Sequence, residues 1–155
     1  MVSPLTGSGL SSTSRSVGVV SLLVAAVGGL SLTGEAGFGV QVTRPDGSEV
    51  AGLYGYLGRA TNNVAEYEAL LHALRYALDQ GARRVRIFSD SELVVRQMEG
   101  RYRVKHPDMI PLHSEARSLL ARFDEVRITH VPREQNREAD RLANRALDER
   151  ASKLQ

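Results

Sequence analysis

The sequence contains no cysteine, and only Lys105 and Lys153 among its 20 lysine and arginine residues are lysines. The absence of cysteine excludes disulfide bonds and cysteine-ligated zinc, and it fits a reducing cytoplasm. A metal ion must then be held by oxygen or imidazole ligands, which favours carboxylates with Mg²⁺ or Mn²⁺. The predominance of arginine favours bidentate contacts with phosphate. A net charge of +2 is by itself weak support for nucleic acid binding, so a motif is needed.

The chain also lacks an apolar run long enough to cross a bilayer. The apolar residues 17–32 fall short of the roughly 20 residues that a spanning helix needs, and only Arg15 precedes them as a positive charge. Their valine-rich start suits a buried strand, so we expect no membrane anchor. A chain of 155 residues fits one domain. We expect residues 16–150 to form it, the Ser/Gly/Thr-rich residues 1–15 to be disordered, and residues 151–155 to fray.

Hydrophobic periodicity and turn signals predict an alternation of strands and helices. The strand patterns are separated by Gly-rich or Pro-Asp-Gly turns, and the helical patterns follow capping residues such as Ser91 and Asn136. The expected strands are 17–24, 38–44, 50–59, 83–90 and 125–132. The expected helices are 64–80, 91–100, 112–123 and 136–154.

This order predicts an α/β fold with a five-stranded mixed sheet. The first three strands follow one another directly and should form an antiparallel meander. The last two strands are reached through helices and should lie parallel to the first strand. Helices should then cover both faces of the sheet.

Three carboxylates stand where elements of this fold begin or end. Asp90 ends a predicted strand, Glu66 lies near the start of the first long helix, and Asp140 lies early in the last helix. Each has a structural explanation, because acids stabilise helix N-termini and aspartate caps helices. Together they lie where one edge of the sheet can gather them. Clustered carboxylates bind hard divalent cations, which support phosphodiester hydrolysis.

Three separated segments carry a more specific signal. They are "TNNVAEYEALLHAL", "IFSDSELVVRQMEG" and "HVPREQNREADRLANRAL". In order and spacing they resemble the signature segments of type 1 ribonuclease H, and the resemblance runs from Gly34 to Asp148. It implies a ribonuclease H-like fold and the metal-dependent, endonucleolytic hydrolysis of the RNA strand of RNA–DNA hybrids, with Mg²⁺ or Mn²⁺ as cofactor. The connection "RYRVKHPDMIP" replaces a basic protrusion, so the chain resembles the compact version of the family.

The resemblance implies a role for each matching residue. It makes Glu66, Asp90 and Asp140 catalytic acids and metal ligands. It places His130 where many members carry a histidine that assists proton transfer or product release, and plain surface polarity is the alternative. Glu68 points to another side of its helix and is expected to be a solvated acid. The remaining residues are expected to contact nucleic acid, with helix capping as the alternative for the first three; they are Thr61, Asn62, Asn63, Ser91, Lys105 and Arg133.

The first strand departs from the family pattern. Members end this strand with an Asp and a Gly-rich turn, and aligning "GEAG" with the end of that turn places Ala26 at the Asp. The same alignment places Leu32 and Thr33 at an Asn and a Pro of the pattern. The nearest acid, Glu35, belongs to the turn and is not expected to reach the site. A carboxylate that bridges two cations in the family is thus replaced by a methyl group.

Two functions are open at this stage. The first is a ribonuclease H-type hydrolase in which the three remaining acids organise the attack of water on the phosphodiester. The second is a catalytically weakened or inactive ribonuclease H fold that binds nucleic acid or a protein partner. A third explanation for the first strand is a change in the encoding DNA, such as a local frameshift.

Overall fold

A computed structural model describes residues 18–28 and 34–153. The expected disorder of residues 1–15 and the aligned positions Leu32 and Thr33 lie outside the described residues. The strands are β1 (Val19–Gly28), β2 (Glu35–Thr43), β3 (Glu49–Arg59), β4 (Arg84–Ser89) and β5 (Glu125–His130). The helices are α2 (Asn62–Asp79), α3 (Glu92–Met98), α4 (Ile110–Leu120), the 3-10 helix η1 (Arg133–Gln135) and α5 (Arg137–Lys153).

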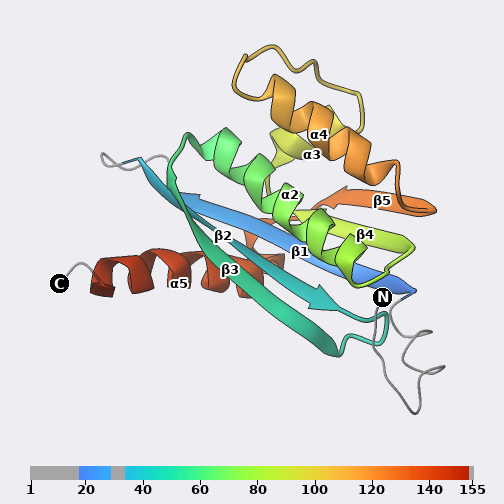
Figure 1. The fold of residues 1–155 in the computed structure, drawn as a ribbon, viewed down its shortest axis with the longest axis horizontal. Helices are drawn as coiled ribbons and strands as arrows, with labels where there is room; N and C mark the ends of the chain where they lie inside the picture. The colour runs from blue at the N-terminus through green and yellow to red at the C-terminus, as the bar shows by residue number, and fades with distance from the viewer. Residues whose placement is uncertain (1–17, 29–33, 154–155) are drawn as a thin grey trace.

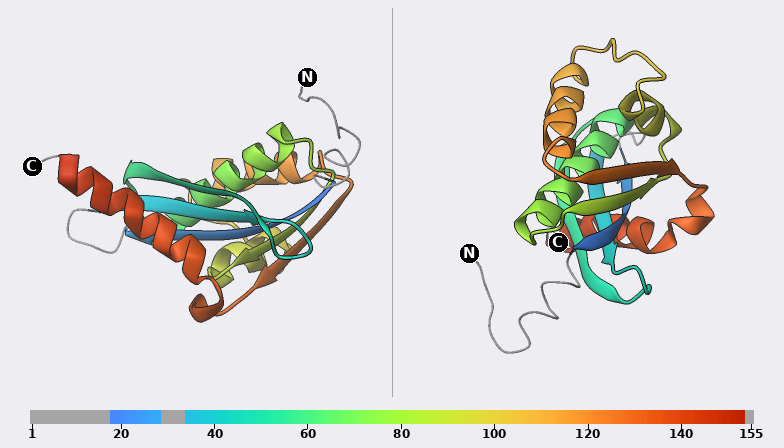
Figure 2. Two further views of the ribbon diagram at one scale, coloured as in Figure 1. Left: turned by 90° about the horizontal axis from the view of Figure 1, so that it is seen from below. Right: turned by 90° about the vertical axis from the view of Figure 1, so that its right-hand side faces the viewer.

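The strands form one mixed sheet in the order β3-β2-β1-β4-β5 (Figure 1). β1 to β3 are antiparallel neighbours, and β4 is parallel to both β1 and β5, so the predicted meander and parallel pair are confirmed. Helices α2, α3 and α4 lie on one face and α5 lies on the other, as Figures 1 and 2 show. No helix in the described part of the chain has the length and apolar character to cross a membrane.

The central strand β1 extends past the end of its neighbour β4. Its parallel register ends with Val24 opposite Ser89, whereas its antiparallel register with β2 continues to Gly28 opposite Ala36. The last part of β1 is therefore paired on one side only. Side chains that follow β4 or begin α2 and α5 can reach this edge of the sheet.

The face covered by α2 is packed with large side chains. Tyr67, Leu70 and Leu74 of α2 are buried, and the ring of Phe38 in β2 stacks on His72 with centroids 4.1 Å apart. Full burial of one such apolar side chain contributes about 1.5–3 kcal/mol. This face is a conventional core, in which side-chain volume separates the helix from the sheet.

The face covered by α5 is packed with small residues. A Cβ atom on Gly39 of β2 would lie 2.1 Å from the carbonyl oxygen of Ala139 and 2.5 Å from the backbone nitrogen of Ala143. A Cβ on Gly37 would lie 2.9 Å from the carbonyl oxygen of Ala143. Only glycine leaves room for a helix backbone this close to a strand. The contact fixes the first turns of α5 against β1 and β2.

Several boundaries of the β-structure differ from the prediction. β1 runs from Val19 to Gly28 and not over residues 17–24, and β5 ends at His130 and not at residue 132. β2 begins at Glu35, whereas the sequence predicts its start at residue 38. The Gly-rich composition hides these strand residues, which are ordered by pairing with β1. Glu35 consequently lies in a strand and not in the turn. The 3-10 helix η1 between β5 and α5 was not predicted.

The start of α2 also differs from the prediction. The sequence predicts a loop through Asn63, but the helix begins at Asn62 because Thr61 caps it. The Thr61 hydroxyl accepts a hydrogen bond from the backbone N–H of Val64 at 3.3 Å. Asn62 and Asn63 therefore lie in the first helical turn, and Glu66 lies in the second turn.

Candidate active site

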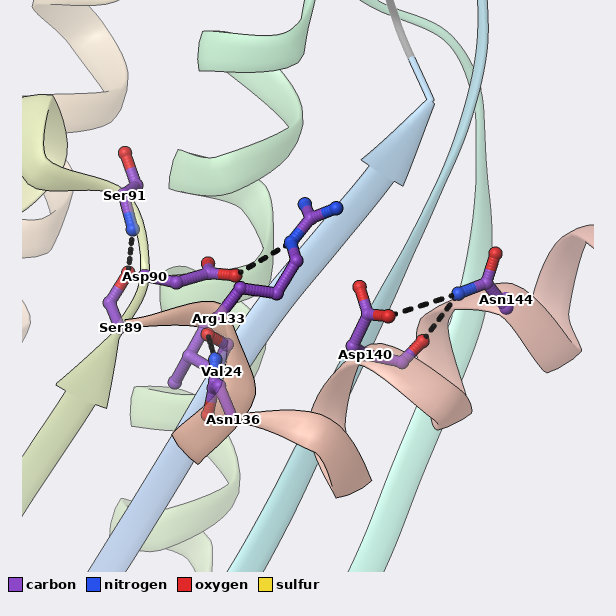
Figure 3. A network of polar contacts seen from close by, with 8 residues as sticks. All are labelled: Val24, Ser89, Asp90, Ser91, Arg133, Asn136, Asp140 and Asn144. Carbon is purple, nitrogen blue, oxygen red and sulfur yellow. Dashed lines mark hydrogen bonds and ion pairs between the residues drawn. The ribbon is translucent and has the colours of Figure 1, made fainter. Parts of the chain in front are cut away.

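Asp90 lies where β4 ends and α3 begins. The backbone N–H of Ser91 donates to Ser89 Oγ at 3.1 Å, and Ser91 Oγ accepts from the backbone N–H of Val94 at 3.3 Å. These bonds fix the backbone on both sides of Asp90, whose side chain is only 5% exposed. The carboxylate points toward β1, across the edge that β4 leaves open (Figure 3).

Glu66 reaches the same edge from α2, and its side chain is buried there. Burial, followed by the negative charge of Asp90, raises the pKa of Glu66 to about 8. The charge of Arg133 and a hydrogen bond from the backbone N–H of Ala26 act in the opposite direction. A carboxyl group in such surroundings holds a proton at neutral pH unless a further cation comes close.

Asp140 is brought to the site by the start of α5. The side-chain amide of Asn136 is buried and donates from Nδ2 to the carbonyl oxygen of Val24 at 2.7 Å, which anchors the helix to β1 (Figure 3). The backbone N–H of Asp140 donates to the carbonyl of Asn136 at 3.0 Å, as a helical bond does. Asn144 Nδ2 lies 3.3 Å from Asp140 Oδ2, so one oxygen of this carboxylate is held along the helix.

Arg133 completes the group from η1. Its Nε donates to Asp90 Oδ2 at 3.3 Å, and its side chain is 65% exposed. In the view of Figure 3 the guanidinium lies over β1, between the carboxylates of Asp90 and Asp140. The sequence predicts a nucleic acid contact for Arg133, and the structure adds an ion pair with one of the site acids. Because η1 was not predicted, the sequence carried no signal for this ion pair.

The carboxylates offer oxygen atoms of the kind that divalent cations prefer. Among the described residues, the buried side-chain atoms without a hydrogen-bond partner are Glu66 Oε1, Asp90 Oδ1, Asp140 Oδ1 and Asn136 Oδ1. Buried oxygens without partners are costly, so a site that concentrates them suits a ligand that they could bind. The same part of the chain holds no three Asp, Glu or His side chains placed closely enough to bind one ion together. The donor atoms therefore fit a cation in chemistry, and binding requires the side chains to draw together.

Ala26 lies beside this group on the central strand. It is buried and pairs with Phe38 across β1 and β2. Directly opposed residues of an antiparallel pair point to the same face, so the Ala26 methyl group shares the α2 face with Phe38. Its backbone N–H contributes to holding Glu66. A side chain at position 26 would thus be directed to the face from which Glu66 enters.

The two other acids considered from the sequence do not join the site. Glu35 accepts a hydrogen bond from the Tyr56 hydroxyl at 3.2 Å, which directs it toward β3. Glu68 is half-buried on α2, two residues beyond Glu66. Nothing in the described contacts connects Glu68 with the carboxylates at the end of β4.

The residues expected to contact nucleic acid belong to separate elements of the fold. Thr61 and Ser91 are helix caps in the structure, which agrees with the capping alternative for Thr61 and leaves their surface contacts open to test. His130 is half-buried at the end of β5, opposite Ser89. Lys105 is exposed in the connection between α3 and α4.

The sequence did not predict the cavity beside Lys105. The connection that carries it lines a cavity of about 550 Å³, next to α3. The charged and aromatic residues around that cavity are Arg101, Tyr102, Arg103, Lys105 and His106. Their clustering in eleven letters, "RYRVKHPDMIP", was the available signal.

A comparison with known families and proteins identifies relatives of this chain. A family model described as "Reverse transcriptase-like" matches residues 26–146, so the match begins at Ala26. The bifunctional protein Rv2228c of Mycobacterium tuberculosis is 47% identical over 116 residues, which cover 74% of this chain and 32% of that protein. The chain thus spans about a third of the length of the first curated relatives it matches.

Two solved structures share most of this fold. RNase H1 from the halophilic archaeon Halobacterium salinarum has a TM-score of 0.81 and 41% identity, covering 85% of this chain and 99% of that chain. LC11-RNase H1, solved in complex with an RNA/DNA hybrid, has a TM-score of 0.80 and 34% identity, covering 85% and 99%. In both cases the similarity extends over nearly the whole solved chain.

Proposed function

Because the chain belongs to the ribonuclease H-like family, we propose that it is a metal-dependent hydrolase that cuts the RNA strand of RNA–DNA hybrids in the cytoplasm. The observation that carries the proposal is the set of buried, unpartnered oxygens on Glu66, Asp90 and Asp140. These acids come from three separate elements and lie at one edge of the sheet. A hybrid is also the ligand in the solved LC11-RNase H1 complex, which has a closely similar fold.

The three acids are the residues that would hold Mg²⁺ or Mn²⁺. Bound divalent ions would supply positive charge to the phosphodiester and lower the pKa of the attacking water. Glu66 interacts more strongly with Asp90 than with Asp140, because the charge of Asp90 raises the pKa of Glu66 more than the charge of Asp140 does. Asp140 approaches from α5, on the other side of β1. The chain therefore carries acidic ligands on both sides of the strand that ends at the site.

Other residues would position the substrate and move protons. His130 stands at the end of β5, where a neutral imidazole can accept a proton near physiological pH. Thr61, Asn62 and Asn63 present hydroxyl and amide groups that can contact 2′-hydroxyls and the backbone of a hybrid. Ser91, Lys105 and Arg133 are the further residues proposed to contact the nucleic acid. Arg133 has guanidinium nitrogens beyond the one bound to Asp90, and phosphate is a suitable ligand for them.

A second candidate function is a weakened or inactive ribonuclease H fold that binds nucleic acid or a protein partner. Ala26 favours it, because a methyl group points to the face where Glu66 enters and a carboxylate is expected from the family pattern. Without that carboxylate the site has one negative charge fewer for binding two cations. In this case the surface would still bind its partner, but the site would not catalyse hydrolysis efficiently.

The deciding experiment is a cleavage assay on a labelled RNA–DNA hybrid, first with Mn²⁺ and then with Mg²⁺. We expect cleavage that Asp90→Asn lowers by roughly a hundredfold or more, as for removal of a group acting on developing charge. Asp148→Asn, an exposed acid on α5, is the matched control and should cut like the wild type. No cleavage together with hybrid binding that weakens steeply with salt would support the second candidate. No binding to hybrid at low salt would overturn both nucleic acid roles.

The role of position 26 can be tested directly. Ala26→Asp should tighten Mn²⁺ binding by about tenfold, because a further carboxylate raises the ligand charge. Ala26→Asn has nearly the same shape without the charge and is the matched control. Equal Mn²⁺ affinity in the two variants, measured by calorimetry, would refute the placement of Ala26 at the missing ligand position.

A further inference from the structure

In the described structure, Arg133 is the residue that forms an ion pair with an acid of the site. Its guanidinium binds Asp90 Oδ2 from the solvent side, with 65% of the arginine side chain exposed and 5% of the aspartate side chain exposed. In the part of the chain that the structure describes, no other lysine, arginine or histidine forms an ion pair with any of the three site acids. The buried carboxylates thus depend on one exposed arginine for their compensating charge.

The electrostatic influence of Arg133 extends beyond its hydrogen bond. Partial burial acts to lower the pKa of its guanidinium. The hydrogen bond to Asp90 and the charges of Asp140, Asp90 and Glu66 outweigh this effect, so the pKa is raised overall. Conversely, the positive charge of Arg133 lowers the pKa of Glu66. An arginine keeps its proton under all ordinary conditions, so this positive charge is permanent.

We propose that Arg133 is the internal counter-ion of the acidic site and competes with a divalent cation for Asp90. The proposal rests on the same three acids as the proposed function. Asp90 has two carboxylate oxygens: Oδ1 has no partner, and Oδ2 is bound by the arginine. A cation that uses both oxygens competes with the guanidinium at Oδ2, and one that uses Oδ1 alone binds beside a fixed positive charge.

The location of Arg133 makes its displacement possible without opening the core. The side chain extends from the short η1 helix and is mostly solvent-exposed, so it can leave Asp90 by rotation about its own bonds. Its guanidinium can then bind a phosphate oxygen of the nucleic acid, for which arginine is well suited. Arg133 therefore stabilises the metal-free site and sets the affinity for the cation.

The first test is Mn²⁺ binding by Arg133→Gln, followed by electron paramagnetic resonance and calorimetry without any substrate. We expect about tenfold tighter binding than in the wild type, because one carboxylate oxygen is released and one positive charge is removed at a partly screened position. Arg133→Lys keeps the charge and should bind Mn²⁺ much as the wild type does. Arg137→Gln removes an exposed arginine four residues further on and is the matched control for net charge. Unchanged or weaker Mn²⁺ binding by Arg133→Gln would overturn the proposal, as would no binding by either protein.

The second test uses thermal unfolding in the presence of EDTA. Arg133→Gln should melt at a lower temperature than the wild type, and adding Asp90→Asn should remove most of that difference, because the carboxylate no longer needs a counter-ion. Additive effects of the two substitutions would contradict the proposed pairing. Neither test measures cleavage. A failed hybrid assay would consequently leave this inference standing, and a failed Mn²⁺ and unfolding test would leave the cleavage result unaffected.

Discussion

The two faces of the sheet are packed in opposite ways, and each delivers a different part of the site. On the α2 face, large side chains such as Tyr67 and Leu70 hold the helix away from the strands. On the α5 face, Gly37 and Gly39 let the helix backbone touch the sheet. Side-chain volume sets the distance between helix and sheet in the first arrangement, whereas backbone contact sets it in the second. Glu66 therefore reaches the site from a helix spaced from the sheet by side chains, and Asp140 reaches it from a helix in close backbone contact with the sheet.

The same contrast applies to the polar groups at the edge of the sheet. Glu66 is buried on the α2 side next to Ala26, and the Ala26 backbone N–H and the charge of Arg133 only partly offset the effect of this burial on its pKa. On the α5 side, Asn136 and Arg133 supply a buried amide and a guanidinium to β1 and Asp90. The α2 side is consequently the electrostatically costly half of the site, and the α5 side is the half that is held by hydrogen bonds.

The largest expected effect concerns the cost of charging Glu66. Burial and the charge of Asp90 raise the pKa of Glu66 from an ordinary 4.5 to about 8 in the folded protein. Between these pH values the folded state binds more protons than the unfolded state, so the free energy of unfolding falls as the pH rises from about 4.5 to about 8. The loss from this one group is at most roughly 5 kcal/mol. Denaturant unfolding in EDTA at several pH values measures it.

Replacing the acid by a neutral amide should remove this pH dependence. Glu66→Gln should be more stable than the wild type near pH 8 and should lose less stability over the same interval. Glu68→Gln, on the same helix but outside the site, should keep the slope of the wild type. Parallel curves of unfolding free energy against pH for the wild type and Glu66→Gln would show that Glu66 does not cause the loss of stability.

The next prediction concerns a substitution that disrupts the contact between α5 and the sheet. Gly39→Ala places a Cβ 2.1 Å from the carbonyl oxygen of Ala139, and this backbone atom cannot move without the helix. We expect a loss of about 1–3 kcal/mol or more, seen as a lower midpoint in urea, together with weaker Mn²⁺ binding as Asp140 shifts. Gly52→Ala is the matched control, since its Cβ would meet only flexible side-chain ends, Leu142 at 3.4 Å and Glu49 at 3.8 Å. Equal stability of the two variants would refute the close-packing argument.

Much of this fold could be predicted because its signals are local. Turn residues and alternating patterns located β3 and the hairpin before it, and the periodicity of α2 and α5 located both helices. The start of β2 at Glu35 could not be predicted from the Gly-rich segment, because its strand conformation depends on pairing with β1. The start of α2 was misjudged because Thr61, and not a later asparagine, provides the cap.

The acids of the site were predicted from motifs, whereas the groups that hold them required the fold. Asp90 and Arg133 are 43 residues apart, and only the parallel placement of β4 and β5 with η1 brings them together. Asn136 looked like a helix cap, and its position before α5 agrees with that prediction. Its side chain, however, donates across the fold to β1, 112 residues away. Partners so distant in the sequence leave no periodic pattern.

A third prediction concerns this anchor on the α5 side. Asn136→Ala removes the 2.7 Å hydrogen bond to Val24 and leaves a carbonyl group without its partner. We expect a loss of about 1–3 kcal/mol in urea unfolding, the usual cost of an unsatisfied buried group. Asn144→Ala, an exposed residue of the same helix, should change stability by less than about 0.5 kcal/mol. Similar losses in both variants would mean that the buried amide has no special role in holding α5.

The smallest expected effect separates the two roles of Thr61 on the α2 side. Thr61→Ala should cost about 1 kcal/mol by removing the cap on the Val64 N–H. Thr61→Asp should cap the helix at least as well, because a carboxylate accepts the same hydrogen bond and suits a helix N-terminus. The added charge should nevertheless repel phosphate and weaken hybrid binding several-fold in a low-salt titration. If Thr61→Asp keeps both the stability and the hybrid affinity of the wild type, Thr61 is a cap alone, and the nucleic acid contact lies elsewhere on the edge.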